Sequence, residues 1–282
     1  MKKILVPTDF SDNAMKAVTY AGKIAQRTGA VIYLLHVLES VIDRILEPFF
    51  LHEKLQDEVT KARLTELKSL KDRLADANPN LAIETELAKG TVTTSILDYA
   101  ENLQADIIIM GTQGASGLKE VFLGSVTGSI IGRTKISILA VPSEYLMEKP
   151  DAIVFATNRY EEDSKMLEKI FELASLFNAV IHVVVFVDMN ASTTNYYIYN
   201  HKQLNEYIGF LKKMYPDVHL TGELLWDKKF EETIEDYNIK NEVDIVAMIT
   251  YPKSFWENLM KKSVTKKMAF HSKIPVLAIP AK

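Results

Sequence analysis

The sequence contains two related halves, and this internal repeat limits the folds that the chain can adopt. The stretch ILVPTDFSDNAMKAVTYAGKIAQRTGAVIYLLHVLE begins at Ile4, and IVFATNRYEEDSKMLEKIFELASLFNAVIHVVVFVD aligns with it from Ile153 without a gap. Two later segments, which begin at Asp106 and Asp244, are identical at 13 of 37 aligned positions. The repeat therefore predicts two copies of one architecture.

Each half alternates between apolar runs and amphipathic segments. The runs ILVP and VIYLLHV predict strands that are covered on both faces. Between them, Ala14, Val18, Ala21 and Ala25 recur at helical spacing. Such alternation predicts a parallel sheet with helices on both faces. We therefore predict an α/β protein with two tandem, doubly wound, Rossmann-like domains at residues 1–146 and 151–282.

A glycine-rich segment in the first half predicts a ligand site. Five of the 11 glycines lie in GTQGASGLKEVFLGSVTGS, directly after the apolar run DIIIM. The N–H groups of such a loop can bind phosphate oxygens, and a helix that starts near Ser125 would add its positive dipole end. Doubly wound sheets bind ligands at the carboxyl ends of their strands. The alternative is that these glycines only make turns and pack a helix closely on the sheet.

The spacing Gly111-x2-Gly114-x9-Gly124-Ser125 resembles the signature of nucleotide-binding universal stress proteins. The segments ILVPTDFS, LLHV, GSVT and ILAVP also resemble that family. Because the resemblance covers both halves, it implies a tandem, UspA-like universal stress protein with an adenine nucleotide alpha hydrolase-like fold.

The resemblance implies an adenine nucleotide in the first half, either ATP or AMP, with Mg²⁺ as a companion of ATP. Asp9, with Pro7 and Thr8, would contact the ribose, and the backbone of Val37 would contact the adenine edge. The residues expected along the phosphates are Met110, Gly111, Thr112, Gly114, Gly124, Ser125, Val126 and Thr127.

The second half lacks these features. Asn158 aligns with Asp9, and Ile249, Pro252 and Lys262 align with the three signature glycines. Proline has no N–H to donate, and the other two side chains would stand where phosphate lies. The alignment thus predicts that the second half has lost the nucleotide site.

The function that the resemblance implies is a stress-response sensor or signalling module. One alternative is a slow ATP-hydrolysing enzyme on the same site, and another is an interaction module that needs no nucleotide. The sequence offers no catalytic residue or metal site, because no nucleophile with a base and no HExxH spacing can be placed near the glycines. At most a weak ATPase activity is expected.

The composition limits the classes of partner and the cellular compartment that can be expected for this protein. The net charge of −4 gives no electrostatic reason to expect nucleic acid. No apolar run approaches the roughly 18 residues that span a bilayer. The first apolar run of the chain is also too short to be the core of a secretion signal. With no cysteine in the chain, these features favour a cytoplasmic protein.

The closing strands of the two halves, ISILAVP and IPVLAIP, predict how the halves associate. An edge strand leaves unpaired backbone groups, and the two copies offer matching edges. The resemblance implies antiparallel pairing of these strands, so that the halves form an intramolecular pseudo-dimer with a pseudo-twofold axis. A further homodimer of the whole chain is left open.

Four other segments each allow two interpretations. His36 is either an ordinary strand residue or a lining residue of the pocket, and NYYIYN either covers a cleft or oligomer contact or packs its own loop. The segment Val41–Leu55 is either a lid or partner surface or packs on its own domain, and KKSVTKK is either an anion site or a solvated helix end.

Overall fold

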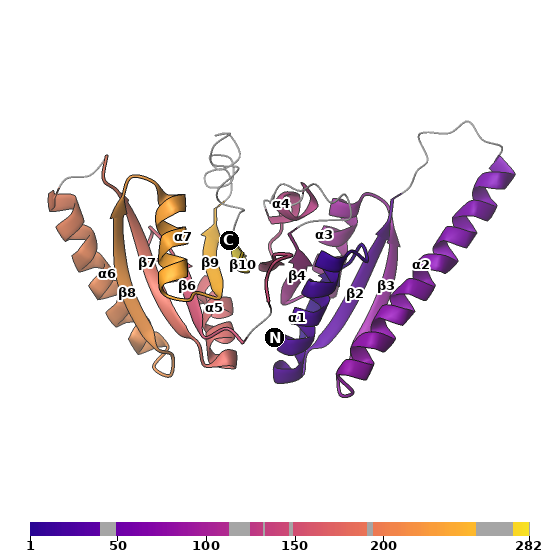
Figure 1. Ribbon diagram of the computed structural model, residues 1–282, viewed down its shortest axis with the longest axis horizontal. Helices are drawn as coiled ribbons and strands as arrows, with labels where there is room; N and C mark the ends of the chain where they lie inside the picture. Colours follow the sequence, from indigo (N-terminus) through magenta and orange to yellow (C-terminus); the bar gives the residue numbers. More distant parts are fainter. Residues whose placement is uncertain are drawn as a thin grey trace. The chain divides into compact units, whose positions relative to one another are not determined.

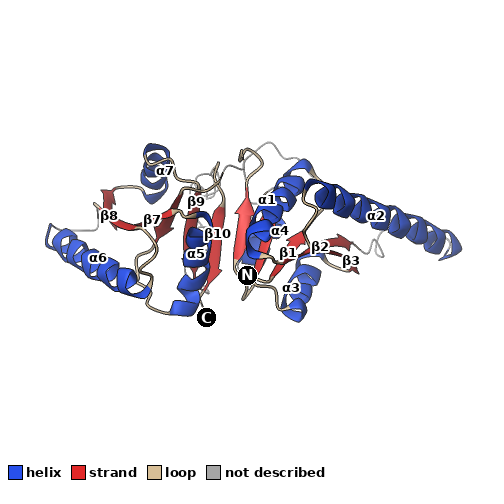
Figure 2. Ribbon diagram, turned by 90° about the horizontal axis from the view of Figure 1, so that it is seen from below, coloured by secondary structure: helices blue, strands red, loops and turns tan. Residues whose placement is uncertain are grey.

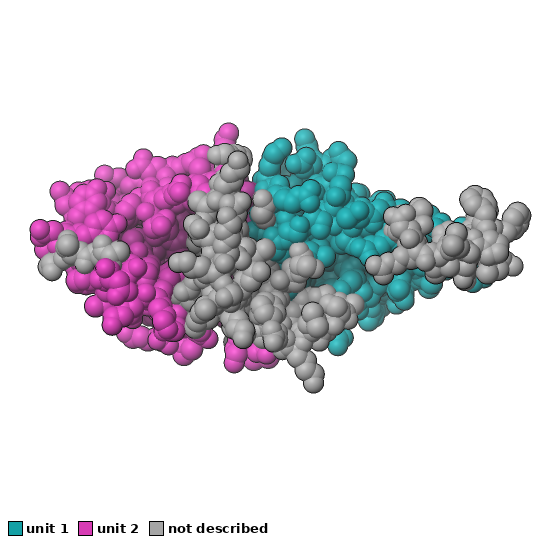
Figure 3. Space-filling model, turned by 90° about the horizontal axis from the view of Figure 1, so that it is seen from above, with its two compact units in different colours: residues 1–119, 123–143 teal, residues 120–122, 144–282 magenta. Residues whose placement is uncertain are grey.

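The computed structural model describes residues 1–39, 49–112, 125–131, 133–146, 149–190, 194–251 and 273–281; for 49–55, 125, 194 and 231 it describes the backbone alone. The chain forms two compact units, and it passes from unit 1 to unit 2 between Ser143 and Glu144 (Figure 3). Among the described helices, none combines the length and the apolar character that crossing a membrane requires.

Unit 1 alternates strands and helices along the chain, as the repeat predicts. Figure 1 shows these elements, with the long helix α2 beside β3 at one side of the unit. The strands are β1 (Lys3–Pro7), β2 (Val31–Leu38), β3 (Ile83–Lys89), β4 (Ile107–Gly111) and β5 (Ile138–Val141). The helices are α1 (Asp12–Thr28), α2 (Phe49–Ala77), α3 (Val92–Leu103) and α4 (Ser125–Ile131).

Unit 2 repeats this order in its described residues. Its strands are β6 (Ala152–Ala156), β7 (Val180–Asp188), β8 (Leu220–Asp227), β9 (Ile245–Thr250) and β10 (Val276–Pro280). Its helices are α5 (Ser164–Phe177), α6 (Thr194–Met214) and α7 (Phe230–Lys240).

The strand order is that of a doubly wound sheet in each unit. It runs β3-β2-β1-β4-β5 in unit 1 and β8-β7-β6-β9-β10 in unit 2. All strand pairs within a unit are parallel. The predicted fold class is therefore confirmed, whereas the pairing of the two closing strands stays a prediction. The order reverses between β1 and β4 and between β6 and β9, so each unit has one topological switch point.

Helices cover both faces of each sheet. In unit 1, α1 contacts α2, and α3 contacts α4. Figure 2 shows α1 and α2 on one side of the strands and α3 on the other. The central strands are accordingly shielded from water, because Ile4, Leu5 and Val6 of β1 are fully buried. This double burial explains why the strands are continuously apolar.

The first helix of each unit begins at a different point of the repeat. Ser11 caps α1, since its Oγ accepts a hydrogen bond from the N–H of Ala14 at 3.2 Å, and Gly29 ends the helix at φ 69°. In unit 2 the cap is Asp163, which accepts from the N–H of Lys165 at 2.8 Å. Helix α5 therefore begins three aligned positions later, which leaves a longer connection after β6.

A polar cluster joins α7 to the sheet of unit 2. His182 Nδ1 lies 2.9 Å from Thr221 Oγ1 and 3.3 Å from the hydroxyl of Tyr237. Burial lowers the pKa of His182, and the nearby carboxylate of Glu223 offsets part of this effect. The same burial raises the pKa of Tyr237 to about 12, with Glu223 adding to the rise. The histidine is therefore held in its neutral form.

This cluster predicts a loss of stability in mild acid. Because the pKa of His182 is lower in the folded chain than its ordinary value of 6.5, the unfolded chain takes up the proton first as the pH falls. The free energy of unfolding should be unaffected above pH 6.5 and should decrease below it. His182→Gln should reduce this decrease in pH-dependent denaturation followed by tryptophan fluorescence, since both tryptophans lie in the second half. The control is His201→Gln at an exposed position; equal pH profiles for the two variants would contradict the assignment.

Candidate functional site

The described residues of the predicted site gather at the carboxyl edge of the sheet of unit 1. Pro7 ends β1, Val37 lies near the end of β2, and Gly111 ends β4. Met110 precedes Gly111 in β4 and is buried. The remaining members either follow these strands or form the first turn of α4: Thr8, Asp9, Thr112, Ser125, Val126 and Thr127. The structure thus brings the described members of the predicted site to the carboxyl edge of one sheet, at and beside the switch point. Gly114, Gly124 and the side chain of Ser125 lie outside the described residues.

The connection from β1 to α1 is held by short hydrogen bonds. The N–H of Thr8 donates to the carbonyl of Leu35 at 2.8 Å, which ties the end of β1 to β2. Asp9 Oδ1 accepts from the N–H of Ser11 at 3.0 Å and from its hydroxyl at 2.6 Å. Asp9 is exposed. Its carboxylate is therefore both a local turn residue and accessible to a ligand, as a ribose contact requires.

Contacts from α1, α4 and β5 hold the end of β4 in place. Thr127 is buried in the first turn of α4, and its hydroxyl donates to the carbonyl of Gly111 at 2.9 Å. The N–H of Thr112 donates to the carbonyl of Val141 at 3.1 Å. A Cβ on Gly111 would lie 2.7 Å from Asn13 Nδ2, closer than real Cβ atoms approach, so the carboxamide would have to shift. The predicted close approach at Gly111 is thus made by α1, as the packing alternative for the glycines proposes.

The side chains of Phe10, His36 and Arg63 lie next to one another beside Thr8, although they come from distant parts of the sequence. His36 Nδ1 lies 2.8 Å from the carbonyl oxygen of Thr8, so Nδ1 carries the proton and donates it. The ring of Phe10 lies against His36 with 4.6 Å between centroids. The guanidinium of Arg63, from α2, lies 5.8 Å from the centre of the Phe10 ring. His36 therefore lies at the edge of the predicted site.

Neither Phe10 nor Arg63 is among the site residues predicted from the sequence. Phe10 has φ 64°, a left-handed conformation that is rare for a bulky residue and often marks a functional turn. No sequence signal identifies Arg63, because the long connection and helix between β2 and β3 show no pattern that would predict which residue meets Phe10.

The equivalent edge of unit 2 keeps one backbone hydrogen bond and has different side chains. The N–H of Thr157, which aligns with Thr8, donates to the carbonyl of Val184 at 3.0 Å. Its hydroxyl donates to Glu161 Oε2, and the hydroxyl of Tyr251, which follows β9, donates to Glu161 Oε1 at 2.7 Å. Only 8% of Glu161 is exposed. Its carboxylate therefore lies between the ends of β6 and β9, at the switch point.

Two further contacts hold this carboxylate cluster together. The hydroxyl of Tyr207, from α6, donates to the backbone carbonyl of Glu161 at 2.5 Å. The guanidinium of Arg159 lies 3.8 Å from the centre of the Tyr251 ring. Burial raises the pKa of both tyrosines, so their hydroxyls remain donors at neutral pH. The longer connection before α5 allows Glu161 to turn inward.

Removing Glu161 should destabilise unit 2. In Glu161→Ala the hydroxyls of Thr157, which is buried, and Tyr251, which is partly buried, lose their charged acceptor. This loss should lower the free energy of unfolding by about 1.5–3 kcal/mol. Urea denaturation followed by tryptophan fluorescence measures this loss. Glu162→Ala, at the exposed neighbouring position, should leave the transition unchanged. Equal transitions for the two variants would show that Glu161 does not organise this edge.

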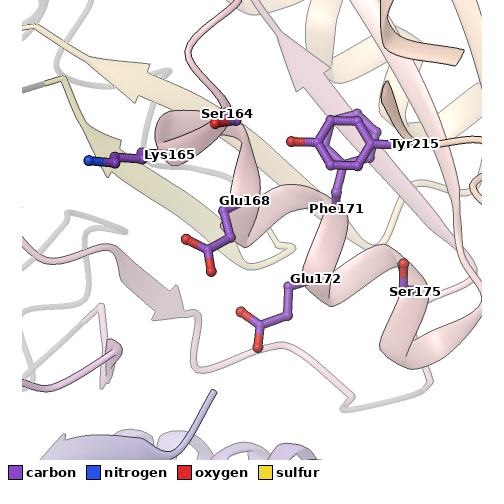
Figure 4. A pocket seen from close by; sticks show the side chains of 7 residues that line it. All are labelled: Ser164, Lys165, Glu168, Phe171, Glu172, Ser175 and Tyr215. Carbon is purple, nitrogen blue, oxygen red and sulfur yellow. The ribbon is translucent and has the colours of Figure 1, made fainter. Parts of the chain in front are cut away.

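A groove of about 380 Å³ lies along α5 and is lined in part by Tyr215 (Figure 4). Its wall carries the carboxylates of Glu168 and Glu172 and the stacked rings of Phe171 and Tyr215, which lie 3.6 Å apart. Charges of both signs line the groove, because Lys165 also contributes to it and Lys169 forms an ion pair with Glu172 at 2.9 Å. The lining therefore identifies no ligand class.

The structure tests only some of the remaining alternatives that the sequence left open. Tyr197 stacks on Trp226 at 4.7 Å, which supports local packing, but Tyr196 and Tyr199 are more than half exposed. KKSVTKK lies outside the described residues, as does the start of the segment Val41–Leu55. In the described part of the chain, no group of three acidic or histidine side chains could hold a metal ion.

Comparison with known proteins identifies the family. The sequence model of the universal stress protein family matches residues 1–142 and again residues 150–280. The chain belongs to the universal stress protein family. Both the predicted family and its tandem form are thereby confirmed.

The relatives agree with this assignment. Universal stress protein Slr1230 of Synechocystis sp. is 25% identical over 98% of this chain and 99% of its own length. Universal stress protein MJ0531 of Methanocaldococcus jannaschii is 31% identical over 50% of this chain and 81% of its own. A universal stress protein from Archaeoglobus fulgidus has a similar fold, with a TM-score of 0.72 at 15% identity over 99% of this chain and 96% of its own.

Proposed function

We propose that this universal stress protein binds an adenine nucleotide, ATP or AMP, at the carboxyl edge of unit 1 and acts as a stress-response sensor or signalling module. The observation that carries the proposal is the grouping of Asp9, Val37 and Gly111 at the carboxyl edge of one sheet, at and beside its switch point. A carboxylate suits the ribose, and the backbone at the strand ends suits the base and the phosphates.

The contrast between the units supports binding in unit 1 alone. Asn158 replaces Asp9 and Ile249 replaces Gly111, while the carboxylate of Glu161 lies where the edge of unit 2 would receive a ligand. A buried carboxylate at this edge repels phosphate. Unit 2 accordingly serves as a structural or interaction domain.

The proposal predicts one nucleotide per chain. Mass spectrometry of ligand released from freshly purified protein would identify the bound species, and calorimetric titration of the emptied chain would count the sites. The same samples, assayed for phosphate release, distinguish simple binding from slow hydrolysis. Two equivalent sites per chain, or no binding of any adenine nucleotide, would refute the proposal.

Asp9→Asn tests the ribose contact. Asparagine retains an oxygen that accepts from Ser11, so the turn is kept while the charge is removed. Nucleotide affinity should decrease by about 1.5–3 kcal/mol, the range for a hydrogen bond to a charged group. The matched control is Asn158→Ala at the aligned, exposed position of unit 2, for which calorimetry should give the wild-type dissociation constant. An unchanged affinity in Asp9→Asn would place the nucleotide elsewhere.

A further inference from the structure

Asn13 is a buried amide in the first turn of α1. Only 6% of this residue is exposed, although asparagine is usually found at the surface. A Cβ on Gly111 would lie 2.7 Å from its Nδ2, 2.9 Å from its Cγ and 3.2 Å from its backbone carbonyl carbon. The carboxamide of Asn13 is therefore packed directly against the backbone at the end of β4.

The backbone that Asn13 contacts is also where the glycine-rich loop begins. Thr127 binds the carbonyl of Gly111 from α4, and the N–H of Thr112 is bound to β5. Asn13 adds the contact from α1. The departure point of the loop is thus defined by α1, α4 and β5 together, and of these contacts only the one with Asn13 requires glycine at position 111.

We propose that Asn13 is a positioning residue of the nucleotide site, because its carboxamide sets the place of the backbone at Gly111 and Thr112, which we expect to lie along the phosphates. This inference rests on the proposed function of unit 1. Asn13 should affect ligands that carry phosphates much more than adenosine, whose expected contacts are Asp9 and Val37.

The aligned residues of unit 2 support a link between the amide of Asn13 and the glycine at position 111. Glu162 aligns with Asn13 and is exposed, while Ile249 aligns with Gly111 and is buried. A side chain at the end of the strand is thus accommodated where the amide does not pack against it. The two positions differ together between the units, as expected if the amide and the glycine form one structural element.

Calorimetric titration of the full chain with ATP and with adenosine tests the role. Asn13→Ala should weaken ATP binding about tenfold, the equivalent of roughly one hydrogen bond, and adenosine binding less than about twofold. Asn13→Asp keeps the shape and adds a negative charge, so it should weaken ATP further and leave adenosine as in Asn13→Ala. The control Glu162→Ala should bind both ligands as wild type does. Equal losses for ATP and adenosine would overturn the positioning role.

Unfolding measurements test the contact without any nucleotide. Gly111→Ala should lower Tm because its methyl group meets the carboxamide. In the double variant Gly111→Ala/Asn13→Ala the nearest remaining Asn13 atom is 3.2 Å away, so part of the lost Tm should return. Additive losses would overturn the inferred contact.

The binding experiments separate the two proposals. Failure of the wild-type chain to bind ATP would refute the proposed function. If the wild-type chain binds ATP and Asn13→Ala leaves the ratio of ATP affinity to adenosine affinity unchanged, only the role of Asn13 is refuted.

Discussion

The rest of the structure depends on burying parallel strands from both faces. Parallel strands need crossover connections, and right-handed crossovers place helices on both faces only when the strand order reverses once. In unit 1 this reversal lies between β1 and β4, so the segments after these strands diverge to opposite faces. Asp9 and Gly111 lie at this reversal, because each of these residues lies at or just after a strand end.

The two units show what this constraint does and does not require. Thr8 and Thr157 make the same backbone hydrogen bond to the neighbouring strand, so the edge is built alike in both copies. The side chains that fill it differ, because α5 begins later than α1 and the longer connection lets Glu161 turn inward. A duplicated domain can therefore keep its sheet while it loses the residues that a nucleotide would need.

Two separate physical reasons favour glycine at position 111. The sequence suggests glycine for the approach of a phosphate, whereas the structure shows that a side chain there would collide with Asn13. The two causes are compatible, since the amide restricts the same backbone from which the loop departs. A glycine in a binding signature can thus be required by helix packing as well as by a ligand.

The sequence by itself determined the duplication, the α/β class and the strand ends at which the site residues stand. Periodicity and capping are local, and Ser11 and Gly29 accordingly bound α1 as their residue types predict. Only the tertiary structure decided which distant side chains meet there, such as Arg63 with Phe10 and Glu161 with Tyr251. Such pairs form after long connections bring the chain back, and their side chains carry no local pattern. The physical reason is that strand ends follow from local apolar periodicity, whereas the contents of a crevice follow from the packing of the whole domain.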